Sequence, residues 1–312
     1  MSRFVDHCLP ILALCAGLFA TSTFGQAPDE VLRVCSDPNN LPLSHRNGEG
    51  YENKIAAEIA SDLGRRLEYT YFPQRMGFVR NTLRKQDPTS REYLCDLIIG
   101  VPARYELTLT TEPYMRSTYA LVFVAKKGLE RIEKPEDLLS LPKKDLKSMR
   151  IGIFEQSPGA DWLLRNGLLA QAVAFAKQSG DPDMSSARIV EEQFAAGSID
   201  AAIVWGPIAG HLIRKHTASP GLEAVPFARD PQIKFDYEIS MGVRRGEKEW
   251  QATLNEWIAT HRERIDEILI SYDVPLVDEG GSLVSGFRTQ GAAHAGGSRH
   301  QDPLQLGNLA PQ

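Results

Sequence analysis

After its first 30 residues, the chain alternates short apolar runs typical of β-strands with segments in which apolar residues recur at helical spacing. Strand-like runs occupy 31–35, 67–71 and 95–100, and the residues from Ile55 to Leu63 have the helical period. Alternating strands and helices are typical of proteins in which helices pack on the faces of a sheet. The sequence therefore predicts an α/β fold.

The same alternation continues beyond residue 118, which predicts a second α/β unit. The last helical segment is amphipathic, because its apolar residues fall on one stripe. The further elements that we expect are strands at 119–124, 150–154, 188–190, 201–204 and 235–243, and helices at 77–83, 161–176 and 250–270.

The first 25 residues have the composition of an export signal. Arg3 gives a positive charge near the start, an apolar run follows at 9–20, and small residues lead to Gly25. The run is shorter than the ~20 apolar residues that a membrane-spanning helix needs. We therefore expect residues 1–25 to be a signal peptide cleaved after Gly25, and the mature protein to be periplasmic, without a membrane span.

Two cysteines, Cys35 and Cys95, remain once the signal peptide is removed. An even number of cysteines in an oxidising compartment favours a disulfide, with two buried free thiols as the alternative. Chain-entropy reasoning gives such a disulfide about 4 kcal/mol of stabilisation. Neither cysteine has a neighbouring Cys or His at metal-ligand spacing, so no metal site is expected.

Charge and composition narrow the range of partners. The formal net charge is −5 and no basic stripe is present, so a nucleic-acid partner is not expected. From 279 to 312 the chain is rich in Gly, Ser, Ala, Gln and His and poor in apolar residues. Such a segment cannot bury enough surface to offset its ordering entropy, so 279–312 is predicted to be a disordered tail with His294 and His300 in solvent.

Several stretches, taken in order, are more specific than the alternation. They are CSDPNNLPLS at 35–44, GEGYENKI at 48–55, PQRMGFVRNTL at 73–83, CDLIIGVP at 95–102, TTEPY at 110–114, RSTY at 116–119 and IVWGPIAG at 203–210. Together they resemble the periplasmic receptors associated with quinoprotein dehydrogenases, the J proteins of methanol-oxidation gene clusters. The resemblance covers roughly residues 30–278.

The resemblance implies the type II periplasmic binding protein fold, in which two α/β lobes are joined by two hinge strands. The first lobe would comprise residues 30–121 and 238–278, and the second lobe residues 122–237. Open α/β sheets bind ligands at the loops beyond the carboxyl ends of their strands. The cleft between the lobes is therefore the expected binding site.

The resemblance also implies a function. The chain would be a non-catalytic periplasmic accessory of a methanol or related alcohol dehydrogenase that depends on pyrroloquinoline quinone (PQQ), of the calcium or the lanthanide type. It would bind the dehydrogenase, or an assembly partner, through its cleft, and no cofactor is expected on the chain itself. The charged stretch 84–92 departs from the shorter glycine-rich connection of the family, so this face need not be a contact surface that the family shares.

Candidate cleft residues lie in loops that follow strands or at the entry to the hinge. In amino-acid receptors of this fold, an arginine binds the ligand carboxylate and an aspartate binds the ligand ammonium. In this chain Arg104 falls near the position of the arginine, and Trp205 occupies the position of the aspartate. An indole cannot neutralise an ammonium, so we expect an aromatic compound or a protein segment instead. The full set is Asp37, Asn39, Asn40, Tyr51, Gln74, Arg75, Val101, Pro102, Arg104, Tyr114, Ser117, Thr118, Gln156, Ser157, Trp205 and Pro207.

Structural roles remain open for several of these residues. Asp37 could stabilise a turn with its own side chain, and Trp205 could pack in the core. Glu52 could favour the positive end of the helix that it begins. Gln156 and Ser157 open a helix after a strand, where free N–H groups could hold an anion.

Catalytic motifs are not found. The histidines are not spaced as in a catalytic triad or a metal site, and the chain has no GxSxG, HExxH or phosphate-binding glycine loop. A solute receptor of an ABC transporter is the first alternative function. A dehydratase is the second, because some proteins of this fold are dehydratases and Glu52 or Glu155 could be the general acid.

Overall fold

The computed structural model describes residues 30–125, 128, 129, 131–176, 181–217, 221–285 and 287. The predicted signal peptide with its cleavage site after Gly25, most of the predicted tail, and both histidines of that tail lie outside the described residues. No helix in the described part of the chain is long and apolar enough to cross a membrane.

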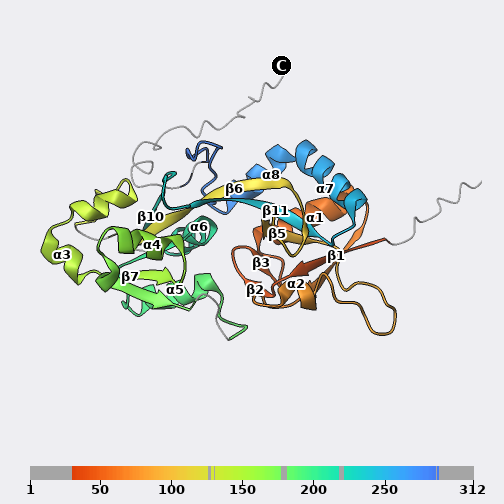
Figure 1. The fold of residues 1–312 in the computed structure, drawn as a ribbon, viewed down its shortest axis with the longest axis horizontal. Helices are drawn as coiled ribbons and strands as arrows, with labels where there is room; N and C mark the ends of the chain where they lie inside the picture. Colours follow the sequence, from red (N-terminus) through yellow and green to blue (C-terminus); the bar gives the residue numbers. More distant parts are fainter. Residues whose placement is uncertain are drawn as a thin grey trace, which may run out of the picture.

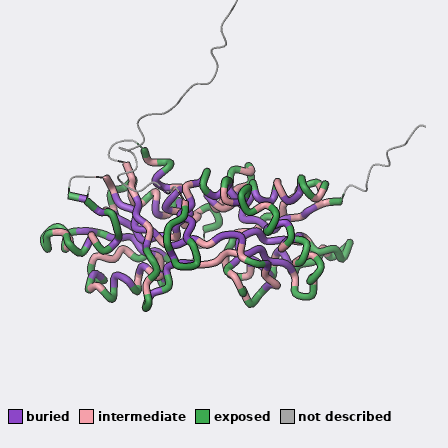
Figure 2. Tube along the Cα trace, turned by 90° about the horizontal axis from the view of Figure 1, so that it is seen from above, coloured by how far each residue is buried: buried purple, intermediate pink, exposed green. Residues whose placement is uncertain are grey.

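The described chain forms two α/β lobes that lie side by side along the long axis of the molecule (Figure 1). The first lobe has one large apolar core, which includes Leu32, Ile59 and Trp257. The second lobe has a core on each face of its sheet, one around Leu121 and the other around Val204. Buried stretches run through both lobes and exposed positions lie at their periphery (Figure 2). The predicted α/β class is confirmed.

The sheet of the first lobe is mixed. β1 pairs in parallel with β4, and Val34 bridges to Leu97 just before β5. β11 runs antiparallel between β5 and β6, and a small antiparallel pair, β2 with β3, follows β1. The strands are β1 Val31–Ser36, β2 Asn39–Asn40, β3 Ser44–His45, β4 Arg66–Tyr71, β5 Ile98–Pro102, the first half of β6 Leu109–Val124, and β11 Asp236–Val243.

The sheet of the second lobe contains the other half of β6. β7 pairs in parallel with β8 and β9, whereas β6 pairs antiparallel with β9 and β10. The 16-residue strand β6 therefore belongs to both lobes. The remaining strands are β7 Ile151–Phe154, β8 Ala172–Phe175, β9 Ala201–Trp205 and β10 Leu222–Pro226.

Helices flank both sheets. The first helix, α1, shows how individual residues determine where a helix begins and ends. The Asn53 side chain accepts the N–H of Gly50 at 3.1 Å and so caps the start of this helix, and Gly64, at φ +64°, follows its end. The first lobe has α1 Tyr51–Asp62, α2 Phe78–Asn81, α7 Lys248–Thr260 and α8 Arg262–Ser271. The second has α3 Lys143–Ser148, α4 Pro158–Arg165, α5 Ser186–Ala195 and α6 Gly206–Lys215, with 3₁₀ turns at Pro135–Ser140 and Leu169–Gln171.

Three segments of the described chain cross between the lobes, and two of them are the predicted hinge strands. β6 and β11 are the first two (Figure 1). The third, which we call the strap, consists of residues 272–285 together with Phe287. Leu276 of the strap bridges to Ser117 of β6, and Phe287 is buried in the core of the second lobe.

The predicted start of the disordered tail at residue 279 is wrong for residues 279–285, which belong to the strap. The Ser285 hydroxyl donates to the main-chain oxygen of Val274 at 3.0 Å and accepts the N–H of Leu276 at 2.9 Å. These bonds turn the chain back on itself around Gly281, which has φ +83°. Contacts with the hinge order a stretch whose own composition does not favour order.

Two predicted elements of the second lobe differ from the structure. The helix expected at 161–176 ends at Arg165, because Gly167 follows at φ +68° and the chain continues into β8. The strand expected at 188–190 is part of α5, whose start is capped when the Ser185 hydroxyl accepts the N–H of Arg188 at 3.3 Å.

The helices of the first lobe also differ in extent. The single helix expected at 250–270 is two helices, α7 and α8, which meet at His261. The imidazole of His261 stacks on Trp257 with ring centroids 4.7 Å apart, and its Nε2 lies 3.1 Å from the Asp62 carboxylate. The helix expected at 77–83 comprises only 78–81.

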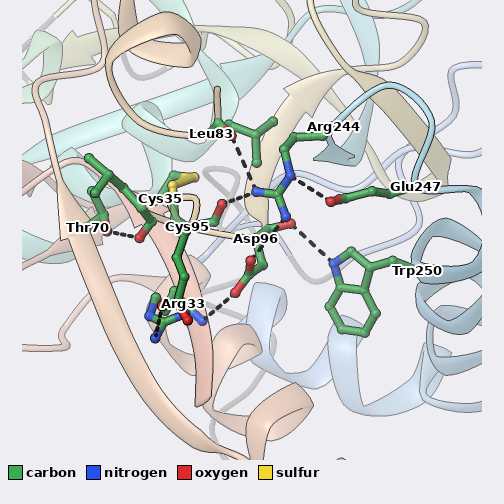
Figure 3. Close-up of polar contacts among 11 residues, drawn as sticks. Arg33, Cys35, Thr70, Leu83, Cys95, Asp96, Arg244, Glu247 and Trp250 are labelled. Carbon is green, nitrogen blue, oxygen red and sulfur yellow. Dashed lines mark hydrogen bonds and ion pairs between the residues drawn. A yellow bond between two sulfur atoms is a disulfide. The ribbon is translucent and has the colours of Figure 1, made fainter. Parts of the chain in front are cut away.

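The predicted disulfide between Cys35 and Cys95 is present, with Cα atoms 5.4 Å apart, and a polar network surrounds it (Figure 3). The Arg244 guanidinium donates to the main-chain oxygen of Cys95 and lies 3.1 Å from the Asp96 carboxylate. The Trp250 indole N–H donates to the main-chain oxygen of Asp96 at 3.2 Å. The network fixes the returning C-terminal part of the first lobe onto its N-terminal part.

Candidate functional site

A small cavity of about 100 Å³ lies where the two lobes meet, and both lobes supply its walls. At its edge the side-chain amide of Asn39 donates a 2.8 Å hydrogen bond to the main-chain oxygen of Asp183. The lobes are therefore in contact here. The first lobe contributes Asp37, Asn39, Asn40, Pro73, Gln74 and Arg75, and the second contributes Ala176, Asp181, Pro182, Met184, Ser185, Ser186 and Ile189.

The first-lobe wall consists of two loops, after β1 and after β4, that predicted cleft residues hold together. The Asp37 carboxylate accepts the main-chain N–H groups of Asn39 at 2.8 Å and Gln74 at 2.5 Å. The Asn40 amide donates to the Gln74 side-chain oxygen at 2.9 Å. Asp37 thus stabilises its own turn and positions the second loop, and the amides of Asn39, Asn40 and Gln74 form a polar, uncharged wall beside Arg75.

The second-lobe wall was missed in the sequence. It follows β8 and leads into α5, where Asp181, Met184 and Ser185 line the cavity. Ser185 is the N-cap of that helix, so a cap signal was present in the sequence. A cap residue can be recognised only when a helix is expected after it. Because a strand was predicted at 188–190, Ser185 was not recognised as a helix cap.

Three aromatic side chains, Tyr119 of β6, Trp205 of β9 and Tyr237 of β11, form what we call the hinge aromatic cluster. The Trp205 ring meets the other two edge-on, with centroids 5.6 Å from Tyr119 and 5.9 Å from Tyr237. All three are half-buried. Trp205 also packs against the core of the first lobe and Tyr119 against a core of the second. The cluster therefore spans the junction between the lobes, but none of its three residues is among those that line the cavity described above.

The electrostatics of the hinge aromatic cluster suit an apolar contact. Burial raises the pKa of the Tyr119 hydroxyl to about 12, so this group stays neutral at physiological pH. The Lys234 ammonium lies 4.9 Å from the centroid of the Tyr237 ring, a cation–π distance. Of the three residues, only Trp205 was predicted as a cleft residue. Tyr119 and Tyr237 were missed because they come beside Trp205 only through the pairing of their strands.

Two predicted cleft residues, Tyr51 and Tyr114, are core residues. Their exposed fractions are 1% and 0%, and the Tyr51 ring packs edge-on against Tyr272 with centroids 5.9 Å apart. The prediction that they face the cleft is wrong in this conformation. The position of a residue after a loop or near the hinge does not show whether its side chain faces the core or the cleft.

Three further candidates are buried parts of the hinge. The Ser117 hydroxyl donates to the main-chain oxygen of Pro275 at 2.8 Å, and the Thr118 hydroxyl donates to that of Phe227 at 2.9 Å. Pro207 is buried in the first turn of α6. The Ser117 and Thr118 side chains fix the crossing strand to its neighbours, and none of the three residues lines the cavity between the lobes.

Arg104, Gln156 and Ser157 do not converge with the other candidates. Arg104 and Gln156 are exposed, have φ of +62° and +57°, and are not among the residues that line the cavity between the lobes. Ser157 is buried at the start of α4, and its hydroxyl has no hydrogen-bond partner in the described chain. The predicted anion site thus has one exposed and one buried member.

Val101 and Pro102 line a different hollow on the first lobe, of about 730 Å³, together with residues of the α2 segment. We call it the α2 groove. Gln74 and Arg75 line both the α2 groove and the cavity between the lobes, so the two lie next to each other.

Glu52 is buried in the first turn of α1, and burial, with the charge of Asp37 as a smaller cause, raises its pKa to about 8. Its Oε1 atom and the Tyr114 hydroxyl have no hydrogen-bond partner in the described chain. Both lie within 4 Å of where a Cβ on Gly100 would be, so the missing side chain there makes room for Glu52. The result is a neutral acid inside the lobe. Glu155, the other suggested acid, is exposed.

Within the described residues, no group of three or more His, Cys, Asp or Glu side chains could hold a metal ion.

No family model matches this chain, but known proteins resemble it, among them the following three. Two are named MoxJ. The one from Methylorubrum extorquens is 27% identical over 276 residues, 83% of this chain and 86% of the relative. The one from Paracoccus denitrificans is 29% identical over 258 residues, which are 79% of this chain and 89% of the relative. The third is the crystal structure of the periplasmic binding protein XoxJ from Methylobacterium extorquens AM1, with 34% identity, a TM-score of 0.60, and coverage of 80% of this chain and all of that one. The structural match confirms the predicted periplasmic-binding-protein fold.

Proposed function

Because this chain belongs to the family of the MoxJ proteins and the periplasmic binding protein XoxJ, we propose that it is a non-catalytic periplasmic accessory of a PQQ-dependent alcohol dehydrogenase. It binds the dehydrogenase, or a partner in the assembly of that enzyme, between its lobes. The dehydrogenase is of the calcium or the lanthanide type.

The hinge aromatic cluster is the observation that carries this proposal. An amino-acid receptor needs a carboxylate for the ligand ammonium. The resemblance puts Trp205 at that position, and the Tyr119 and Tyr237 rings lie around it. The three half-buried rings combine apolar faces with polar tips, which is the chemistry enriched at the centres of protein–protein interfaces. Arg104, the expected partner of a ligand carboxylate, is exposed and has no aromatic contact with the cluster.

Direct binding tests the proposal. The alcohol dehydrogenase of the source organism, purified with its PQQ, is passed over the immobilised protein, and the dissociation constant is measured by surface plasmon resonance. We expect Tyr237→Ala to weaken binding at least tenfold, since a buried interface aromatic contributes about 2 kcal/mol or more. Tyr71→Ala, which removes another partly exposed tyrosine of the chain, is the matched control and should change the constant less than twofold.

The alternative of a solute receptor has a separate readout. A tight ligand raises the melting temperature by mass action, so a thermal-shift screen of small solutes, aromatic compounds among them, identifies one. Micromolar binding of a solute, with no binding of the dehydrogenase, would replace the proposed function with a transport role. Among the described residues, nothing favours the dehydratase alternative, since Glu52 is buried inside the first lobe and Glu155 is exposed.

A further inference from the structure

The α2 groove has an apolar floor and rim on the surface of the first lobe. Phe78, Val79 and Val101 are buried and form its inner side. Met76 and Leu107 are 87% and 44% exposed, which places two large apolar side chains in solvent at its rim. Exposed apolar side chains gathered around a hollow are typical of interaction sites. Methionine also adapts its shape to varied partners.

The charge of the groove is opposite to that of the chain. Arg75, Arg80 and Arg84 line it, and no acidic residue does, whereas the whole chain has 40 acidic and 35 basic residues. The Arg84 guanidinium donates to the main-chain oxygen of Leu107, which fixes it at the rim. The Arg80 guanidinium extends back along the loop, with Nη2 3.4 Å from where a Cβ on Gly77 would be. Arginine pairs with carboxylates through its planar fork of donors.

We propose that the α2 groove docks an acidic segment of a partner protein, in which an apolar or aromatic side chain is flanked by carboxylates. The apolar side chain packs between Met76 and Leu107, and the carboxylates pair with the arginines. Because Gln74 and Arg75 line the groove and the cavity between the lobes, the segment continues from the groove toward the cleft. This surface lies outside the cleft, so the inference goes beyond the proposed function.

The groove excludes two other occupants by its chemistry. A nucleic acid would meet an apolar floor on a protein of net charge −5, which repels it. A basic segment would face three like charges. An apolar segment without carboxylates would offer no complementary charge to the arginine-lined rim, and complementary charge sets partner choice at an interface.

Fluorescence anisotropy with synthetic peptides tests the inference. The probe is a fluorescein-labelled peptide with Leu-Phe flanked by three Glu on each side. The control peptides replace Leu-Phe by Gly-Gly or every Glu by Lys, and heparin oligosaccharide is the general polyanion. We expect micromolar binding of the probe alone, weakened at least fivefold when salt rises from 50 to 300 mM. Equal binding of the Gly-Gly peptide or of heparin, or no binding of the probe, would overturn the inference.

Variants of the full chain locate the binding. Arg80→Glu and Met76→Asp should each weaken binding of the probe at least tenfold. Because both positions are exposed, the melting temperature of the protein should be unchanged. Arg46→Glu, the same charge change at an exposed arginine that does not line the groove, should have no effect. Probe binding that survives Arg80→Glu places the site elsewhere and overturns the inference. Since no dehydrogenase is present, failure here is distinct from failure of the proposed function.

Discussion

At the scale of single residues, Glu52 is the side chain whose chemistry the fold changes most clearly. Its carboxyl is buried near Asp37 and beside Gly100, which keeps its Oε1 atom from water. Desolvation is the main cause of its raised pKa of about 8, against an ordinary value of 4.5. The folded state therefore holds a proton that the unfolded state releases at neutral pH.

The pH dependence of stability follows from that proton. The stabilising contribution of the Glu52 proton is fully present below about pH 4.5 and is lost as pH rises toward 8. In that window, the rise in pH lowers the free energy of unfolding by at most about 1.4 kcal/mol per pH unit. Glu52→Gln should remove this component, because the amide does not titrate. Urea unfolding of both proteins at pH 5.5, 6.5 and 7.5 measures it. Parallel curves would show that Glu52 is ionised in the fold.

The sequence located residues better than it oriented them. Asp37, Asn39, Asn40, Gln74 and Arg75 do meet at the first-lobe wall, because loops after neighbouring strands lie at the same edge of a sheet. The inward turn of residues such as Tyr51 and Tyr114 could not be read, since burial depends on which distant element covers each face.

At the scale of elements, α6 shows how closely the lobes are joined. A Cβ on Gly206 would lie 2.3 Å from the main-chain oxygen of Thr118, and one on Gly210 would lie 2.1 Å from that of Asp273. Both glycines are therefore required by close approach of backbone to backbone. The helix rests directly on the crossing strand β6 and on the strap.

Gly210→Ala should destabilise the protein by about 1–3 kcal/mol, because the added methyl group overpacks a rigid contact. Helix propensity alone predicts the opposite, a gain of about 1 kcal/mol. Chemical unfolding thus distinguishes the two by the sign of the change. A variant as stable as the wild type would mean that the strap moves away from α6 at little cost.

Element types were predictable where a short apolar run marks a buried strand, and predictions failed where tertiary contacts decide the structure. The strands at 150–154 and 201–204 match β7 and β9, whereas 188–190 was misread because Ile189 and Val190 favour strands intrinsically. The break at His261 has no glycine or proline to announce it. It follows from packing against α1 through Asp62.

At the scale of the whole molecule, the strap adds a connection that a two-strand hinge lacks. Its first part contributes Val274 and Leu276 to the core of the first lobe, and Phe287 enters a core of the second. The sequence pattern did not show this crossing, since the order of strands and helices is complete before it begins. Only the relative placement of the two finished lobes creates the surface on which the strap lies.

Deletion of residues 274–312 should therefore lower the melting temperature by several degrees and separate the unfolding of the lobes into two transitions. The physical reason is the loss of apolar contacts to both cores and of the hydrogen bond from Ser117 to Pro275. Differential scanning calorimetry measures it, with deletion of 288–312 as the control that leaves the strap in place. One unshifted transition in the longer deletion would show that β6 and β11 couple the lobes alone.

The position of β11 between β5 and β6 has a consequence for the order of synthesis. Both of its neighbours in the first lobe are made long before it, and in the folded sheet each of them pairs with β11 and not with the other. A nascent chain that has reached the second lobe thus carries two open strand edges, which are prone to pair with other chains. The interval between residues 124 and 236 is the period in which the growing protein is most exposed to aggregation, and in which a chaperone has most to protect.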